Sequence, residues 1–259
     1  MLDWMKKAFA KPPQKETPNA APPGMEIPDG LFDVVYAVGD LHGRLDLLLE
    51  SDQRIEADIS PDQRALVVYL GDYIDRGPDS RGVVEHLRSR RELKFLKLCL
   101  RGNHEDIFLN FLERPLEEWS WLNLGGKETL RSYGLTLDPF RDRDLDEQTL
   151  KEMLNVHVPE SHRRFFTKTR LWARCGDFLF VHAGIQPAVP LELQNPMDLM
   201  WIREPFLSKG PDLPLRVVHG HTPGKAITYG PNRIGIDTGA YATGRLGILK
   251  IVDGTTSEL

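Results

Sequence analysis

Five short motifs, each directly after an apolar run, constrain the fold of this chain more than any other feature. They place Asp, His or Asn beside glycine and read Gly39-Asp40-Leu41-His42-Gly43, Gly71-Asp72-Tyr73-Ile74-Asp75-Arg76-Gly77, Gly102-Asn103-His104-Glu105, Val181-His182-Ala183-Gly184 and His219-Gly220-His221-Thr222. The preceding runs are short and rich in β-branched residues, which is typical of buried strands. Glycine just past a strand lets the backbone turn sharply. The pattern predicts polar side chains at the carboxyl edge of a sheet, where α/β folds place their sites.

The spacing of the first three motifs indicates βαβ units. Asp72 follows Asp40 by 32 residues, and Asn103 follows Asp72 by 31. A strand, a crossover helix and the next strand together need about thirty residues. The intervening segments, 46–59 and 80–93, carry enough apolar residues to form helices. Adjacent parallel strands would bring the first three motifs together at one edge of the sheet.

The residue types in these motifs are those of a metal site. A lone Asp or His after a strand is more often a turn residue or a helix cap, so a single motif carries little weight. Asp40 and His42 are two residues apart, and along a strand both would face the same side. Three such motifs at βαβ spacing, with two histidine motifs at later strand ends, favour metal binding over capping.

The combination of motifs resembles that of the phosphoprotein phosphatases, in their bacterial type, among the calcineurin-like metallophosphoesterases. The resemblance covers roughly residues 33–252. It implies an α/β fold in which a central β-sandwich, built from βαβ units, is flanked by helices, with a mostly helical cap inserted at 106–170. It also implies metal-dependent hydrolysis of phosphomonoesters by direct attack of a metal-bridging hydroxide. The expected substrates are phosphoserine and phosphothreonine, with phosphotyrosine as an open alternative.

The same resemblance implies a two-metal centre with Asp72 bridging both ions. Manganese is the expected metal, and iron or zinc are the alternatives. The remaining ligands would be Asp40 and His42 for one ion and, for the other ion, Asn103, His182 and His221. In the last motif His219 is the alternative ligand, but the family pattern Gly-His-Thr matches Gly220-His221-Thr222 and favours His221.

Protonation of the leaving group and binding of phosphate need further residues. A histidine oriented by a carboxylate is suited to supply a proton, and His104 and Asp75 occupy the family positions for that pair. Guanidinium groups suit phosphate because their planar donors are bidentate, and Arg76 and Arg203 are the candidates. Arg203 lies in a segment that resembles the Trp-x-Arg-Glu of bacterial and phage members, although a surface ion pair with Glu204 is the alternative. We count Asn103 among the phosphate-binding residues as well.

Two other functions compete with protein phosphatase activity. Hydrolases of symmetrical dinucleoside polyphosphates, such as diadenosine tetraphosphate, are close relations in sequence, but they typically lack the aspartate that orients the acid. Asp75 is present here, which favours phosphomonoesters. A metal-bound binding module without turnover would be expected to have lost a ligand or His104, and neither is lost.

Composition agrees with a single catalytic domain. The chain has 259 residues, of which 41% are hydrophobic, and a formal net charge of −5. That length suffices for one large α/β domain, and the mild acidity argues against a nucleic-acid partner. Cys99 and Cys175 are expected as buried thiols, which suits the cytoplasm. The chain lacks an apolar run of about eighteen residues, so we expect no stable membrane insertion. The expected partner is a phosphorylated protein or peptide.

The first thirty residues differ from the rest. Residues 1–30 are rich in proline and are predicted to form a flexible tail, followed by a catalytic domain at 31–259. Residues 1–10 carry Leu2, Trp4, Met5 and Phe9 with two lysines, and could touch a membrane or a partner weakly. A mobile tail is the favoured interpretation.

Overall fold

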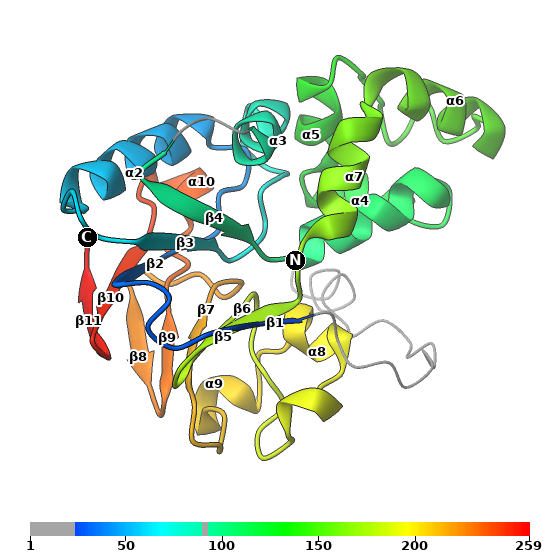
Figure 1. The fold of residues 1–259 in the computed structure, drawn as a ribbon. Helices are drawn as coiled ribbons and strands as arrows, with labels where there is room; N and C mark the ends of the chain where they lie inside the picture. Colours follow the sequence, from blue (N-terminus) through cyan, green and yellow to red (C-terminus); the bar gives the residue numbers. More distant parts are fainter. Residues whose placement is uncertain (1–23, 90–92) are drawn as a thin grey trace.

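Two β-sheets lie face to face, and helices cover their outer sides (Figure 1). The computed structural model describes residues 24–89 and 93–259. In spatial order, the first sheet contains β11 (Thr255–Glu258), β10 (Ile248–Val252), β2 (Val34–Val38), β3 (Ala65–Tyr69) and β4 (Phe95–Cys99). The second contains β1 (Gly24–Ile27), β5 (Trp172–Cys175), β6 (Phe178–Val181), β7 (Arg216–His219), β9 (Arg233–Gly235) and β8 (Thr228–Gly230).

The predicted βαβ units supply three consecutive strands of the first sheet. Strands β2, β3 and β4 pair in parallel. The crossovers are α2 (Leu45–Asp58) and α3 (Ser80–Arg88), close to the predicted segments 46–59 and 80–93. The prediction of parallel neighbours is therefore confirmed, and the first three motifs leave this sheet at one edge.

Residues of these strands contribute to two cores because side chains alternate between the faces of a sheet. Val35 and Ala37 of β2 pack between the two sheets, together with Phe180 of the second sheet. Val34 and Tyr36 pack instead against the helices outside the first sheet. Burial on both faces explains why β2 and β3 read as continuous apolar runs.

A third apolar cluster covers the outer face of the second sheet. There Val181 and Val217 pack against Leu199 and Phe206. The covering elements are η2 (Leu191–Leu193), α8 (Pro196–Trp201) and α9 (Phe206–Lys209). This layer fixes the positions of β6 and β7, the strands that lead into the fourth and fifth motifs.

The insertion at 106–170 is helical, as predicted, and lies beside one end of the sandwich (Figure 1). Its elements are α4 (Asn103–Glu113), η1 (Trp119–Leu124), α5 (Gly126–Ser132), α6 (Glu147–His157) and α7 (Glu160–Lys168). Trp121 is fully buried, and its ring lies 4.7 Å from Phe111 and 5.1 Å from Phe108 between centroids. Because α4 starts within the third motif, the cap is joined directly to the candidate site.

The N-terminal boundary differs from the prediction of a tail over residues 1–30. Residues 24–27 form β1, which pairs in parallel with β5, and Ile27 is buried in the core between the sheets. The ordered sandwich therefore starts before residue 31. The amphipathic segment at 1–10 lies outside the described residues.

Two further expectations concern membranes and cysteines. Over residues 24–89 and 93–259, no helix has both the length and the apolar character needed to cross a bilayer. Cys99 and Cys175 are free thiols, as expected, although each is only half-buried.

Candidate active site

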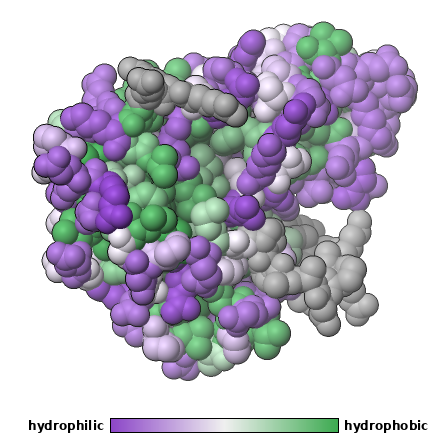
Figure 2. All heavy atoms as spheres, in the orientation of Figure 1, coloured by the Kyte–Doolittle hydropathy of each residue, from purple (hydrophilic) through white to green (hydrophobic). Residues whose placement is uncertain are grey.

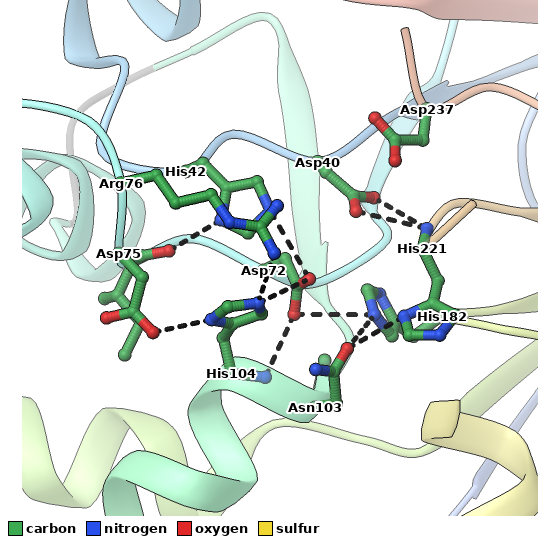
Figure 3. Close-up of polar contacts among 12 residues, drawn as sticks. Asp40, His42, Asp72, Asp75, Arg76, Asn103, His104, His182, His221 and Asp237 are labelled. Carbon is green, nitrogen blue, oxygen red and sulfur yellow. Dashed lines mark hydrogen bonds and ion pairs between the residues drawn. The ribbon is translucent and has the colours of Figure 1, made fainter. Parts of the chain in front are cut away.

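The five motifs meet where strands of both sheets end. Figure 3 shows their side chains converging from loops that are far apart in the sequence. Backbone hydrogen bonds join the loops in pairs: the His42 amide donates to Asp72 O at 2.8 Å, and the Gly220 amide donates to His182 O at 2.7 Å. All the predicted ligands are buried. The structure thus gathers residues that the sequence placed only at separate strand ends.

The backbone of these loops is strained. Nine non-glycine residues of the described chain have positive φ, a conformation that is uncommon outside glycine and costs energy. Five of the nine belong to the candidate site, namely His42, Asp72, Asp75, Arg76 and His221. Such strain persists only where surrounding structure enforces it, and its concentration here supports a functional role for these loops.

Two motif glycines are required by close packing around the carboxylates. A Cβ atom on Gly102 would lie 2.1 Å from Asp72 Oδ1, and one on Gly220 would lie 2.1 Å from Asp40 Oδ1. Both distances are far inside van der Waals contact. Any side chain at either position would displace a candidate ligand.

The first ligand group consists of His42, Asp72 and His104, whose ligand atoms lie within 4.8 Å of one another. His42 Nδ1 donates to the carbonyl of Ile74 at 2.9 Å, which leaves the lone pair on Nε2, 3.6 Å from Asp72 Oδ2. Asp40, predicted for this site, lies nearby but outside the group. Its two oxygens accept the backbone N–H of His221 at 3.1 and 3.2 Å.

The second ligand group consists of Asp72, His182 and His221. His182 Nδ1 donates to Leu70 O at 2.9 Å, so its Nε2 is the free ligand atom, 3.4 Å from Asp72 Oδ1. Asn103 Oδ1 lies 3.0 Å from that Nε2 and 2.9 Å from His221 Nδ1. Among the described residues, the buried Nε2 of His221 has no hydrogen-bond partner.

His219, the alternative ligand, lies outside both groups. Its ring packs against Phe206, with the centroids 5.1 Å apart. Burial lowers the pKa of His219 to about 4, so the ring is neutral at physiological pH. The geometry therefore places His221, and not His219, with the other candidate ligands.

The charges of the site fit two divalent cations. Burial lowers the pKa of His42, His182 and His221, which keeps the imidazoles neutral with lone pairs available. Burial disfavours the charge on Asp72, but the surrounding imidazoles outweigh it and lower the pKa of that carboxyl. A carboxylate shared by two groups of neutral imidazoles, with an amide oxygen beside them, is a suitable donor set for borderline divalent metals.

His104 and Asp75 form the predicted pair. His104 Nδ1 donates to Asp75 Oδ2 at 2.5 Å, and its Nε2 faces the centre of the site, 3.9 Å from Asp72 Oδ2. Burial opposes the positive charge on His104, but Asp72 and the hydrogen bond to Asp75 outweigh it and raise the pKa of the imidazole. The ring can therefore hold a proton on Nε2, where a leaving group would meet it.

The cap holds Asp75 in place. Trp121 Nε1 donates to Asp75 Oδ2 at 2.7 Å, and Thr129 Oγ1 donates to Asp75 Oδ1 at 2.6 Å. With His104, these donors satisfy a carboxylate that is fully buried. Trp121 also packs against Phe108 and Phe111 in the core of the cap. For Trp121, the structure adds a specific contact that orients the carboxylate behind His104.

The two arginines border the same space. Arg76 Nη1 lies 2.8 Å from His42 Nε2, Arg76 Nη2 lies 3.0 Å from His104 Nε2, and its guanidinium lies 4.9 Å from the centre of the Tyr241 ring. Arg203 is half-buried, with Nη2 3.4 Å from the carbonyl of His221. Burial, and then the charge of Arg76, lower the pKa of Arg203. An anion between the two guanidinium groups would pair with the buried charge of Arg203 and offset its repulsion by Arg76.

Sequence reasoning missed Asp237 and assigned no role to Glu105. Asp237 lies beside Asp40 (Figure 3), and burial, with the nearby charge of Asp72, raises the pKa of Asp237 to about 6. A signal was available, since Asp237 follows β9 within Gly235-Ile236-Asp237-Thr238-Gly239, which repeats the strand, Asp, Gly pattern. Glu105 accepts the backbone N–H groups of Asp72, Tyr73 and Gly102 at 2.8 to 2.9 Å and so fixes the loop that carries Asp72.

A fold of two packed sheets with buried Asp, His and Asn residues at their strand ends defines a metallophosphoesterase. Residues 34–246 match the family model described as calcineurin-like phosphoesterase. The chain therefore belongs to the calcineurin-like phosphoesterase family, and it is a hydrolase of phosphate esters. Members of this family bind two divalent metal ions, and the two ligand groups fit that requirement.

The relatives in sequence carry the names of two activities, protein phosphatase and dinucleoside tetraphosphatase. Serine/threonine-protein phosphatase 1 of Salmonella typhimurium is 30% identical over 231 residues, which span 84% of this chain and 91% of that protein. A symmetrical bis(5′-nucleosyl)-tetraphosphatase of Nitrosospira multiformis is 31% identical over 159 residues, spanning 61% of this chain and 46% of that protein. Among solved structures, one provisionally described as a diadenosine tetraphosphatase has a TM-score of 0.62 at 20% identity and covers 93% of this chain and 98% of its own. At that identity the likeness shows the fold alone.

Proposed function

We propose that this protein is a metal-dependent phosphoprotein phosphatase that hydrolyses phosphoserine and phosphothreonine. The observation that carries the proposal is the buried His104–Asp75 pair, which faces the carboxylate common to both ligand groups. An alkoxide leaving group, as in a serine or threonine ester, needs a proton, and this pair is placed to deliver one. The relative that matches over most of both chains also carries the name of a serine/threonine phosphatase.

The proposal assigns a part to each side chain of the site. Asp40, His42 and Asp72 would hold one divalent ion. His104, although it lies in the first geometric group, is assigned to proton transfer because its Nδ1 is bound to Asp75. Asp72, Asn103, His182 and His221 would hold the other ion. When bound, two such ions lower the pKa of water and polarise the phosphoryl group, and manganese is our expectation for both. Arg76 and Arg203 orient the phosphate oxygens with charge-assisted hydrogen bonds. Asn103 contributes to phosphate binding as well as to the second metal site. His104 carries the proton at Nε2, and Asp75 fixes its ring.

Parallel kinetics on three substrates test the proposal. Full-length protein, stripped with a chelator and supplied with Mn²⁺, should turn over phosphoserine and phosphothreonine peptides faster than diadenosine tetraphosphate. A matched phosphotyrosine peptide decides whether aryl esters are also accepted. If diadenosine tetraphosphate is by far the best substrate, the dinucleoside polyphosphate hydrolase is the correct function and the protein phosphatase proposal fails.

Replacing Arg203 with alanine should weaken phosphate binding without loss of metal. A charge-assisted hydrogen bond contributes roughly 1.5–3 kcal/mol, or about 10- to 150-fold in binding. We expect the KM for p-nitrophenyl phosphate and the inhibition constant of inorganic phosphate to rise by factors within that range. The matched control is Arg143→Ala, which removes an exposed arginine of the cap. Unchanged inhibition by phosphate in the Arg203 variant would favour the surface ion pair with Glu204.

Replacing Asp237 with asparagine should weaken one of the two metal sites. Asp40 and Asp237 place two buried carboxyl groups side by side, and their mutual repulsion is best relieved by a cation. Loss of an outer-shell partner typically costs about 10- to 100-fold in metal affinity. Calorimetric titration of the stripped protein with Mn²⁺ should show one weakened and one unchanged site. Asp144→Asn, an exposed carboxylate in the cap, is the control; two unaltered sites in Asp237→Asn would contradict the assignment.

A further inference from the structure

A groove of about 380 Å³ runs along the outer side of β4, between α3 and α7, and none of the residues assigned to the active site lines it. In Figure 2, which shares the orientation of Figure 1, an apolar area over β4 lies beside a hydrophilic strip that follows α7. The apolar part of the lining comes from Leu87 of α3, Leu98 of β4 and Phe165 of α7.

The groove follows the open edge of a strand. Strand β4 is the last strand of its sheet and pairs only with β3 among the described strands. Lys97 and Leu98 point to opposite faces of the sheet, and both line the groove, so the groove runs along the edge itself. At one end the edge is closed, because the amide of Arg170 donates to Cys99 O at 3.1 Å. An open edge presents backbone donors and acceptors to an added strand.

The charged part of the lining is entirely basic. It contains Arg88, Lys97, Arg164, Lys168 and Arg170 and no acidic side chain, although the chain as a whole carries a net charge of −5. Arg88 is paired with Glu85 at 2.6 Å, and Arg164 lies 3.8 Å from Glu160. Lys168 and Arg170 are exposed and form no ion pair with any residue that the structure describes. Positive charge at this edge is therefore in excess.

We propose that the groove docks an extended acidic segment of a protein substrate, which adds a strand to the edge of β4 while its carboxylates face the cations. The inference rests on the proposed phosphoprotein phosphatase function. The apolar side chains and the strand edge suit a polypeptide better than a nucleic acid, because only a polypeptide backbone can continue the sheet. Strand β4 leads directly to Asn103, so a docked segment holds its phosphorylated residue close to the site and raises its effective concentration.

Direct binding tests the groove separately from catalysis. The probe is a fluorescent, unphosphorylated peptide of about eight residues that alternates Glu and Val, a length typical of strands. Fluorescence anisotropy should show saturable binding that weakens as salt increases. The double variant Arg164→Glu, Lys168→Glu should weaken binding by about 10-fold or more, since it reverses two charges against the peptide. Arg131→Glu, Arg141→Glu, which reverses two exposed charges of the cap outside the groove, should not.

Two further probes identify the mode and the class of ligand. In a peptide of the same sequence, N-methylation of alternate backbone amides removes the N–H groups that would donate to the edge of β4. This peptide should bind at least about 10-fold more weakly. Equal binding by the methylated peptide would overturn strand addition. A single-stranded oligodeoxynucleotide of similar charge that competes as well as the peptide would overturn the assignment to an acidic polypeptide.

Kinetics then connect docking to turnover. The groove variant should show a raised KM for a phosphopeptide that carries the acidic segment, with unchanged kcat, and unaltered kinetics on p-nitrophenyl phosphate. Peptide binding that survives the charge reversal would refute the groove. Failure of the wild-type protein to hydrolyse any phosphoester with metal supplied would instead refute the proposed function, and the anisotropy result would stand independently.

Discussion

Replacing Asp72 with asparagine should remove metal from both sites at once and reduce phosphoesterase turnover more than any other single change. Asp72 is the only residue common to the two ligand groups found among the described residues. Its oxygens face different partners, with Oδ1 3.4 Å from His182 Nε2 and Oδ2 3.6 Å from His42 Nε2. Loss of an outer-shell contact already costs about 10- to 100-fold in metal affinity, so loss of this shared carboxylate should cost more than about 100-fold at each site.

The measurement is metal content and Mn²⁺ affinity, followed by turnover. Asparagine keeps the size of the side chain and can still accept the amide of His104, a bond of 3.1 Å in the native protein, so the fold should survive. Asp62→Asn, at an exposed carboxylate, controls for the change in net charge. A folded Asp72 variant with two tightly bound metals and near-normal turnover would rule out the bridging assignment.

Replacing His104 with asparagine should reduce turnover of alkyl phosphates by about 10²- to 10⁴-fold while both metals stay bound, the range typical of a positioned general acid. The reason is its position, since Nε2 faces the site and Nδ1 is fixed on Asp75. The loss should be much smaller for p-nitrophenyl phosphate, because p-nitrophenolate needs little protonation on leaving.

Comparison of the two leaving groups separates acid catalysis from general damage. Asp75→Asn should show the same dependence on leaving group with a smaller loss of turnover, because the Asp75 side chain acts only by orienting His104. His157→Asn serves as the matched control, since this half-buried histidine of α6 bonds the carbonyl of Tyr133, away from the site. Equal losses on alkyl and aryl phosphates would show that His104 is not the acid.

Much of the fold and site was predictable because the signal is local. Each motif contains a strand end, a glycine and a polar residue within a few positions, and parallel strands must bring their carboxyl ends together. The crossovers α2 and α3 followed from the thirty-residue spacing for the same reason. The choice of His221 over His219 needed the family pattern, since both lie at the end of one strand.

Other features depend on contacts between distant parts of the chain. Strand β1 has only four residues, at the end of a proline-rich stretch, and it forms because β5 supplies a parallel partner. Trp121 and Thr129 reach Asp75 from 46 and 54 residues away, through the packing of the cap. No local pattern encodes such a contact, because it depends on how whole elements pack.

The sequence by itself determined which residue types stand at the strand ends, and hence that a metal-binding edge would form. Only the tertiary structure decided which of them face one another. Asp40 accepts the amide of His221, 181 residues away, and lies beside Asp237, whereas His42, Asp72 and His104 gather into one group. The physical reason is that strand order and the packing of the two sheets set these distances, while periodicity and spacing act only along the chain.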